Sequence, residues 1–350
     1  MTASPLAGAI ILSIGGCSSA LCYTPQKKTR GWSWQSYWMA QAAVCWLILP
    51  WIGAWATTPH LLAVLTETPT RVMVNTALLG ALFGIGGTAF GVAIRYLGFS
   101  ITYAIAIGIS CVVGTIFTPV VSGQLVVLLA RRGTAWVLAG VGVAAIGILV
   151  SGLAGWLKDG DLRQSNALQE GFQLGKGLVF CVLAGLFSAV FGISLDVGRP
   201  IAAIAADHGA GQFEGNVIYI FSCGGAFLTT MAYCVYLHLR QQTLGEYVKL
   251  ESGRTSEILL INYFMALLTG VLWYGQFFLY GAGQVGMGEY KFSSWAIINA
   301  MVVFFSAMVG LVMREWRGCR PRTWAALAAA FLLLLGAVGL MTYGNYLGSA

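Results

Sequence analysis

The chain has 350 residues, of which 58% are hydrophobic and only 9% are charged. A soluble domain carries charged side chains on about a quarter of its residues, so this composition excludes a soluble enzyme or a soluble binding module. The net charge of +7 does not indicate nucleic-acid binding, because the basic residues are spread over short links between apolar stretches. We therefore expect a protein that crosses a membrane several times.

Ten apolar stretches are long enough to cross a bilayer, because a helix needs about 20 apolar residues to span roughly 30 Å of hydrocarbon. The stretches are continuous and longer than the alternating segments of about ten residues that build membrane β-barrels, which favours helices. The predicted spans are 5–23, 34–56, 71–95, 101–123, 134–154, 174–197, 214–239, 257–281, 291–313 and 323–345. The links between them leave no room for a separate catalytic domain.

The third span carries glycines at a spacing of three or four residues, namely Gly80, Gly84, Gly87 and Gly91. Residues at this spacing share one helix face, where bare backbone lets a neighbouring helix approach closely. The face is compatible both with ordinary tight packing and with a surface that slides during a rocking motion.

The distribution of Lys and Arg predicts the orientation of the chain. The links that follow spans 1, 3, 5, 7 and 9 hold 14 of the 19 basic residues, and the opposite side holds five. The basic side is expected to face the cytoplasm. Both termini are therefore predicted to be non-cytoplasmic.

The polar link around residues 158–176 divides the ten spans into two groups of five, in residues 1–165 and 166–350. An odd number of spans per half places the second half upside down relative to the first. Similar motifs open spans 5 and 10, Arg132-Gly133-Thr134-Ala135-Trp136 and Arg322-Thr323-Trp324. Inverted repeats are common in secondary transporters, which bind substrate where the halves meet. We predict an all-α polytopic membrane protein with ten transmembrane helices arranged as two inverted five-helix repeats.

Two acidic residues lie close to apolar runs. Asp196 ends the sixth span, and Glu289 precedes the ninth. An acid at mid-bilayer costs about 2.5–3.5 kcal/mol on insertion scales, so it usually has a partner or a role. Each acid has two interpretations: an ion pair with a nearby base, Arg199 or Lys291, or a proton-coupling role.

Aromatic and amide side chains are concentrated in the eighth and ninth spans, and the topology places them in the outer half of the membrane. Aromatic rings stack on the C–H face of a sugar, and amides pair with hydroxyls that lose water on binding. An interfacial aromatic belt is the alternative, but a belt needs no amides. The candidate substrate-binding residues are Trp273, Gln276, Phe277, Tyr280, Trp295 and Asn299.

No motif predicts a metal site, a cofactor or a catalytic centre. The eight Cys residues are scattered without a CxxC pair, and the three His residues are far apart in the sequence. Intramembrane catalysis would need a His/Asp cluster, a metal motif or a Ser/Lys pair inside the spans. We expect no enzyme, no metal and no cofactor.

The chain resembles the L-rhamnose–proton symporters, a branch of the drug/metabolite transporter superfamily with ten helices in two inverted halves. The matching segments occur in order from end to end. They are Tyr23-Thr24-Pro25-Gln26-Lys27-Lys28, Trp32-Ser33-Trp34, Ile48-Leu49-Pro50-Trp51, Arg95-Tyr96-Leu97-Gly98, Ala104-Ile105-Ala106-Ile107-Gly108-Ile109, Gly114-Thr115, Thr118-Pro119, Trp273-Tyr274, Gln276-Phe277-Phe278, Tyr280, Ser294-Trp295, Gly310-Leu311-Val312 and Glu315-Trp316.

The resemblance implies import of a 6-deoxyhexose by proton symport and alternating access in the bacterial inner membrane. The expected partners are a monosaccharide, protons as the coupling ion, and the lipid bilayer. Asp196 and Glu289 depart from the family's pattern, which has amides at these places, and this leaves open altered coupling or substrate range. An exporter or exchanger of another metabolite is the alternative; a membrane-embedded enzyme or a sensor is a remote one.

Overall fold

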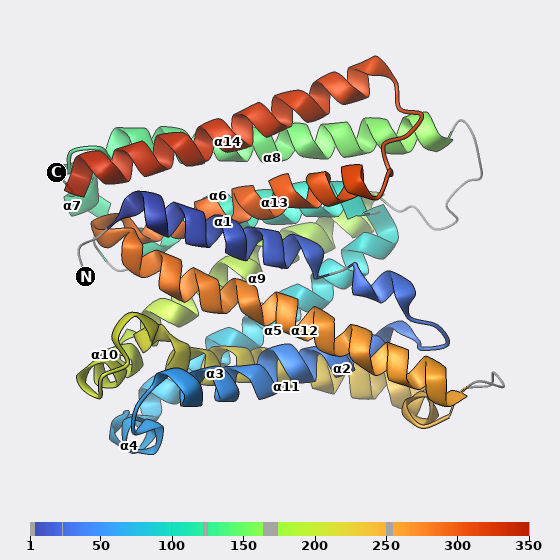
Figure 1. Ribbon diagram of the computed structural model, residues 1–350, viewed down its shortest axis with the longest axis horizontal. Helices are drawn as coiled ribbons and strands as arrows, with labels where there is room; N and C mark the ends of the chain where they lie inside the picture. Colours follow the sequence, from blue (N-terminus) through green and yellow to red (C-terminus); the bar gives the residue numbers. More distant parts are fainter. Residues whose placement is uncertain are drawn as a thin grey trace. The chain divides into compact units, whose positions relative to one another are not determined.

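The computed structural model describes residues 4–22, 24–97, 99–121, 123, 125–163, 174–249 and 255–349 (Figure 1). All regular secondary structure in these residues is helical. Nine of the described helices are long and apolar enough to cross a membrane, and a shorter apolar segment, Thr102–Phe117, lies within α6 (Phe99–Val121). The all-helical polytopic architecture is confirmed, while the arrangement as two five-helix repeats stays a prediction.

The helices form two compact units, and each unit combines separated parts of the sequence. Unit 1 comprises Met1–Ala20, Gly86–Ile193 and Ala282–Ala350, and unit 2 comprises Leu21–Ile85 and Ser194–Gly281. The predicted division at residue 165 separates two sequence repeats, whereas these units are groups of helices in contact. The units therefore do not test that division.

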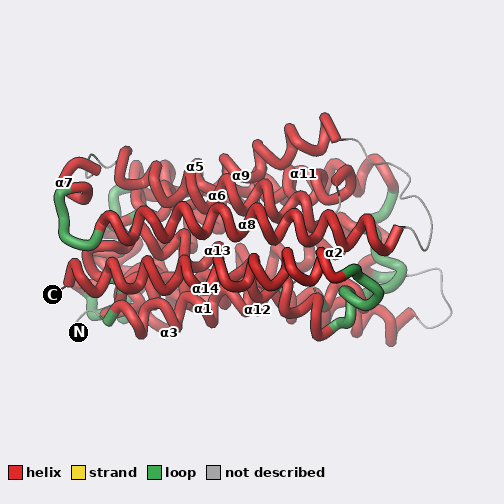
Figure 2. Tube along the Cα trace, turned by 90° about the horizontal axis from the view of Figure 1, so that it is seen from above, coloured by secondary structure: helices red, strands yellow, loops and turns green. Residues whose placement is uncertain are grey.

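Unit 1 contains the helices at both ends of the chain. Its elements are α1 (Pro5–Leu21), the end of α5 (Thr70–Leu97), α6, α7 (Leu125–Leu129), α8 (Thr134–Arg163), α9 (Leu174–Val197), the end of α12 (Thr255–Gly286), η5 (Gly288–Ser293), α13 (Ser294–Val312) and α14 (Pro321–Ser349). Helix α1 begins, and α14 ends, at the same end of this unit (Figure 1). The tube view shows the same helices from above (Figure 2).

Helices α8 and α14 pack side by side in antiparallel directions. A Cβ atom at Gly344 would lie 2.7 Å from the carbonyl oxygen of Gly133, and one at Gly140 would lie 2.6 Å from Cγ of Met341. Contacts this close require bare backbone, because a larger side chain would force the helices apart. Small residues therefore set the separation of this pair.

Unit 2 contains the second predicted span as one continuous helical stretch with an irregular middle. Its elements are η1 (Pro25–Lys28), α2 (Trp34–Ala42), the π-helical turn η2 (Ala43–Ile48), α3 (Leu49–Thr57), α4 (Leu61–Glu67), the start of α5, the end of α9, α10 (Arg199–Asp207), η3 (Gly211–Val217), α11 (Ile218–Gln241), η4 (Leu244–Tyr247) and the start of α12. Pro50 follows the π-helical turn, in the first turn of α3, and as a proline it has no N–H to donate to the turn before it.

The predicted glycine face of the third span packs against α11 in unit 2. A Cβ atom at Gly80 would overlap the carbonyl oxygen of Ser222, and one at Gly225 would overlap that of Ala77. The two glycines thus make reciprocal backbone contacts. One helix turn further, the hydroxyl of Thr229 donates a 3.1 Å hydrogen bond to the carbonyl oxygen of Ala81. This part of the face serves tight packing.

Two short helices, α4 and α10, occupy stretches that the sequence predicted as links. The inner face of α10 buries Ile201 and Ala205 in a core that includes Val64 of α4 and Val217. Both helices have an apolar face that requires cover, which explains why these links fold back on their unit rather than extending into water.

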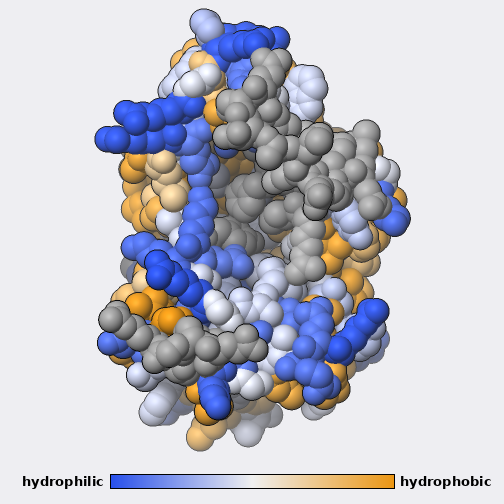
Figure 3. Space-filling model, turned by 90° about the vertical axis from the view of Figure 1, so that its right-hand side faces the viewer, coloured by the Kyte–Doolittle hydropathy of each residue, from blue (hydrophilic) through white to orange (hydrophobic). Residues whose placement is uncertain are grey.

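The sides of the described helices carry large exposed apolar side chains, and the charged residues lie at helix ends. Figure 3 faces the side where α8 ends and α14 begins, and hydrophilic side chains gather at these ends. Exposed apolar residues such as Leu149 and Leu332 lie further along the same two helices. Apolar helix sides with charged residues at the helix ends suit helices whose sides face hydrocarbon.

Candidate functional site

Three tryptophans form an aromatic cluster inside unit 2, which we call the tryptophan cluster: Trp38, Trp46 and Trp273. The Trp273 ring meets Trp38 at a centroid distance of 5.6 Å and Trp46 at 5.3 Å, both edge to face. Trp273 is 9% exposed and Trp46 is 1% exposed. Two aromatic neighbours of Trp273, Trp38 and Trp46, therefore come from the second span. The sequence-based site did not include this span.

Other predicted residues of α12 lie around this cluster. Phe277 is buried, and its backbone carbonyl accepts a 2.8 Å hydrogen bond from the Tyr219 hydroxyl. Its ring also meets Phe83 at 6.4 Å. Gln276, next to it in the sequence, is half-buried. Phe277 thus forms part of the packed core of unit 2, whereas Gln276 is partly exposed.

Tyr280 lies in the last two turns of α12, within electrostatic range of Asp196 and Arg199. The Asp196 carboxylate pairs with the Arg199 guanidinium at 2.7 Å. Asp196 is 21% exposed and Arg199 is 56% exposed. The ion pair that the sequence offered as the simpler interpretation is therefore present, and it adjoins one of the aromatic candidates.

Trp295 and Asn299 lie in unit 1, on α13. The Trp295 indole N–H donates a 3.0 Å hydrogen bond to the backbone carbonyl of Ser110 on α6. Asn299 is buried, and its side-chain N–H donates to the Trp295 carbonyl at 2.7 Å. Gly114 leaves room for the indole, since a Cβ atom there would lie 2.5 Å from Nε1 of Trp295. The predicted residues thus form two groups, one in each unit.

Glu289 lies in η5, directly before α13, the helix that carries Trp295 and Asn299. Its side chain lies outside the described residues. The next residue, Tyr290, is buried, and its hydroxyl donates a 2.6 Å hydrogen bond to the backbone carbonyl of Arg132. The backbone that carries Glu289 is therefore held against the start of α8.

A polar network at one end of unit 2 joins links that are distant in sequence. The Glu246 carboxylate accepts hydrogen bonds from the Ser33 N–H at 2.6 Å and from the Ser36 hydroxyl at 2.5 Å. His238, which is fully buried, hydrogen-bonds the hydroxyls of Thr243 and Tyr247 at 2.7 and 3.1 Å. Burial raises the pKa of Tyr247.

Gln35 belongs to the same end of unit 2 and is also hydrogen-bonded. Its amide N–H groups donate to the side-chain oxygen Oε1 of Gln241 and to the Thr243 hydroxyl, each at 2.9 Å. Glu246 lies in η4, outside the ten predicted spans, and no sequence motif indicates this network. It fixes the start of α2 against the end of α11.

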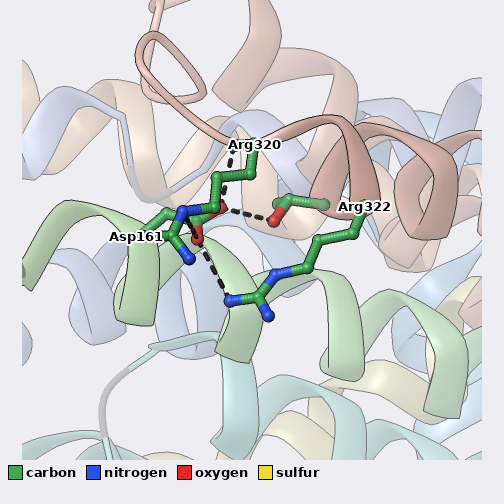
Figure 4. A network of polar contacts seen from close by, with 4 residues as sticks. Asp161, Arg320 and Arg322 are labelled. Carbon is green, nitrogen blue, oxygen red and sulfur yellow. Dashed lines mark hydrogen bonds and ion pairs between the residues drawn. The ribbon is translucent and has the colours of Figure 1, made fainter.

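Unit 1 has a comparable network around Asp161, at the end of α8 (Figure 4). The Asp161 carboxylate accepts hydrogen bonds from the backbone N–H of Arg320 at 2.9 Å and from the Thr323 hydroxyl at 2.6 Å. The guanidinium of Arg322 approaches it at 3.4 Å. These contacts hold the first turn of α14, whose free N–H groups favour an acidic partner.

No group of three or more His, Cys, Asp or Glu side chains that could hold a metal ion occurs in the described part of the chain. The groups that can bind a ligand in both units are aromatic rings, amides and hydroxyls. Such a set suits a neutral ligand with many hydroxyls better than a charged one.

Comparison with known proteins extends over almost the whole chain. The family described as L-rhamnose-proton symport protein matches residues 1–346. A protein from Cronobacter sakazakii, described as an L-rhamnose-proton symporter, is 33% identical over 333 residues, which cover 95% of each chain. Proteins of the same description from Enterobacter and Klebsiella pneumoniae are 33% and 32% identical over the same share. The family and these relatives are transporters rather than enzymes.

Proposed function

Because the chain belongs to the L-rhamnose-proton symport protein family, we propose that it imports L-rhamnose or a related 6-deoxyhexose together with protons across the bacterial inner membrane. The family match from residue 1 to residue 346 is the observation that carries this proposal. The long apolar helices and the uncharged aromatic and amide groups support it, because a sugar carrier needs both. No metal or cofactor is part of the proposal.

The proposed sugar-binding residues keep the two groups described above. In unit 2 they are Trp273, Gln276, Phe277 and Tyr280; in unit 1 they are Trp295 and Asn299. Trp273 offers an indole face for the C–H side of the sugar ring, and Gln276 and Asn299 offer amides for hydroxyls. The burial of Phe277 supports a role in shaping the site by packing against its neighbours.

Asp196 and Glu289 are the proposed proton-coupling residues. Asp196 combines partial burial with a single short ion pair, so protonation would release Arg199 and change the charge beside Tyr280. One charge moved through 100 mV supplies about 2.3 kcal/mol. Each 1.4 kcal/mol changes a concentration ratio tenfold, so this free energy corresponds to roughly fifty-fold sugar accumulation. One proton per sugar therefore suffices for scavenging.

We propose alternating access in a fold of two inverted repeats, as in the drug/metabolite transporter superfamily. The composition of the compact units supports this repeat. Helices that stand five spans apart fall in the same unit: α2 with α11 in unit 2, and α6 with α13 and α8 with α14 in unit 1. The boundaries between units cut α5 and α12, which are also five spans apart.

The antiparallel packing of α8 and α14 gives further support for inversion. Gly133 at the start of α8 lies against Gly344 near the end of α14, and Asp161 at the end of α8 binds Arg320 beside the start of α14. Equivalent helices of inverted repeats run in opposite directions.

We propose that both termini face away from the cytoplasm, as the Lys and Arg distribution predicts. Alkaline phosphatase fused after residue 350 is expected to be active, and a fluorescent protein fused there is expected to stay dark. The reverse pattern would reject this orientation without affecting the transport proposal.

Uptake by purified protein in proteoliposomes tests the function. With an imposed inward proton gradient, radiolabelled L-rhamnose is expected to accumulate, and a protonophore is expected to abolish accumulation. Accumulation that ignores the protonophore would reject symport. Exchange of preloaded sugar without gradient-driven accumulation would favour an exchanger.

A further inference from the structure

Gln41 is a buried amide with no hydrogen-bond partner among the described residues. It lies on α2 in unit 2, is 1% exposed, and neither its Oε1 nor its Nε2 atom is paired with any of the described residues. Buried polar side chains in folded proteins nearly always have partners, because an unpaired buried amide loses its bonds to water without replacement. An amide that the fold leaves unpaired is therefore suited to pair with a ligand.

The position of Gln41 places it beside the tryptophan cluster. It follows Trp38 by three residues within α2, which places both on one helix face. Trp273 meets the rings of both Trp38 and Trp46, so it spans the turn of α2 that carries Gln41. The backbone carbonyl of Gln41 also lies against Gly270, one turn before Trp273: a Cβ atom at Gly270 would be 3.1 Å from it.

Trp46 has the same unusual property. Its indole N–H is buried and has no partner among the residues described by the structure. Tyr274, next to Trp273, is buried, and its hydroxyl has no partner among the described residues; it lies against Gly53 of α3. The second span and the segment around Trp273 thus carry an amide, an indole N–H and a phenol that are buried, unpaired within the described residues and uncharged.

The backbone at this place is irregular. The π-helical turn Ala43–Ile48 carries Cys45 and Trp46. Such turns occur often at functional sites, because one extra residue turns the following side chains to a different direction. Here the turn directs the Trp46 ring onto Trp273, which is the second observation that singles out this segment.

We propose that Gln41 and Trp46 bind hydroxyl groups of the transported sugar, with the Trp273 ring as the adjoining stacking surface. This inference rests on the proposed function and adds two residues from the second span to its site. The Gln41 amide can both donate to and accept from adjacent hydroxyls, whereas the Trp46 N–H can only donate. A neutral polyhydroxylated ligand satisfies both, and an anion would satisfy only the donors.

The test replaces Gln41 with Leu and compares it with Gln35→Leu in the same helix. Gln35 is also buried, but its amide is already paired with Gln241 and Thr243. L-rhamnose binding to each purified variant is measured by calorimetry, and the melting temperature is measured without sugar. Gln41→Leu is expected to bind L-rhamnose about 10- to 100-fold more weakly, with an unchanged or higher melting temperature. Gln35→Leu is expected to lower the melting temperature and to leave the affinity unchanged.

Unchanged affinity in Gln41→Leu would overturn the inference. If Gln41→Leu fails to fold, Trp46→Phe provides the second variant, since it keeps a ring and removes the N–H. Binding to Trp46→Phe is expected to weaken by about 5- to 10-fold, and wild-type affinity there would also overturn the inference.

Deoxy analogues of L-rhamnose separate binding from indirect effects. In one analogue the hydroxyl bound by Gln41 is missing. The wild-type protein should bind this analogue more weakly than it binds L-rhamnose, whereas Gln41→Leu should bind the analogue and L-rhamnose with equal affinity. A purely structural role would weaken all analogues equally. Failure of the proposed function is distinguishable, because wild-type protein would then bind no L-rhamnose at all.

Discussion

The Thr323 hydroxyl, in the first turn of α14, donates a 2.6 Å hydrogen bond to the Asp161 carboxylate at the end of α8. The Asp161 side chain is 1% exposed, although both of its arginine partners, Arg320 and Arg322, are more than half exposed. The stabilising contacts are therefore the hydrogen bonds from Thr323 and the Arg320 backbone, since exposed ion pairs contribute little.

Asp161→Ala is expected to lower the melting temperature, because it removes the charge-assisted hydrogen bonds from Thr323 and from the Arg320 backbone. Thermal unfolding in detergent, followed by size-exclusion chromatography, measures the change. Glu257→Gln is the control, since Glu257 is exposed at the start of α12, and it is expected to stay within about 0.5 kcal/mol of wild type. Equal stability of both variants would show that the Asp161 contacts are unimportant.

Gly80→Ala and Gly225→Ala are each expected to destabilise unit 2 by about 1–3 kcal/mol, because the added methyl group overlaps the backbone of the facing helix. Gly224→Ala is the matched control one residue away, where a Cβ atom would meet no atom within 4 Å. There the higher helix propensity of alanine favours a gain of up to about 1 kcal/mol. The same measurement of thermal unfolding distinguishes them, and a stable Gly80→Ala would contradict the close packing of α5 and α11.

Trp273→Ala is expected to abolish measurable L-rhamnose binding, because it removes the ring that joins the tryptophan cluster. Titration calorimetry on purified protein measures the affinity. Trp55→Ala is the control in the same unit, since Trp55 is 79% exposed on α3. Because loss of a buried ring can also cost about 3–5 kcal/mol of stability, Trp273→Phe is measured in parallel and is expected to bind weakly. Unchanged affinity in either Trp273 variant would remove this residue from the site.

Asp196→Asn is expected to uncouple sugar transport from protons. The variant should still exchange L-rhamnose across proteoliposome membranes, but it should no longer accumulate sugar in response to a pH gradient, because an amide cannot carry the proton. Asp207→Asn, at the end of α10 in the same unit, is the control and should retain accumulation. Wild-type pH dependence in Asp196→Asn would assign the Asp196–Arg199 pair a structural role only.

Nine of the ten predicted spans correspond to described helices that are long and apolar enough to cross a membrane. Their positions could be predicted from the sequence, because a continuous apolar run of about 20 residues is a strong signal. Helix ends could not. Span 5 was expected to stop at residue 154, yet α8 continues to Arg163. Those extra turns bury Asp161, which the sequence placed in a polar link. Its burial depends on Thr323 and the Arg320 backbone, which lie about 160 residues away, and no local pattern reveals such a partner.

The residues of the proposed site could be selected from the sequence only in part. Trp273 was identified because aromatic and amide residues are concentrated in α12. Gln41 and Trp46 were missed, because a lone amide and a tryptophan in an apolar span look like ordinary packing residues. Their significance depends on two facts that only coordinates supply: the absence of a partner among the described residues, and the π-helical turn that directs Trp46 to Trp273. The density of tryptophan in this span was the available signal.

The π-helical turn Ala43–Ile48 also makes the second span tolerant to a change of length at one place. Deleting one residue from this turn would convert it to an ordinary α-helical turn and leave the hydrogen bonding of the flanking helices intact. The deletion would leave the flanking helices in nearly the same rotation, because the wider turn absorbs the angle of its extra residue, but it would remove the local displacement of Cys45 and Trp46. A shortened chain is therefore expected to insert and fold while the Trp46 ring loses its position against Trp273.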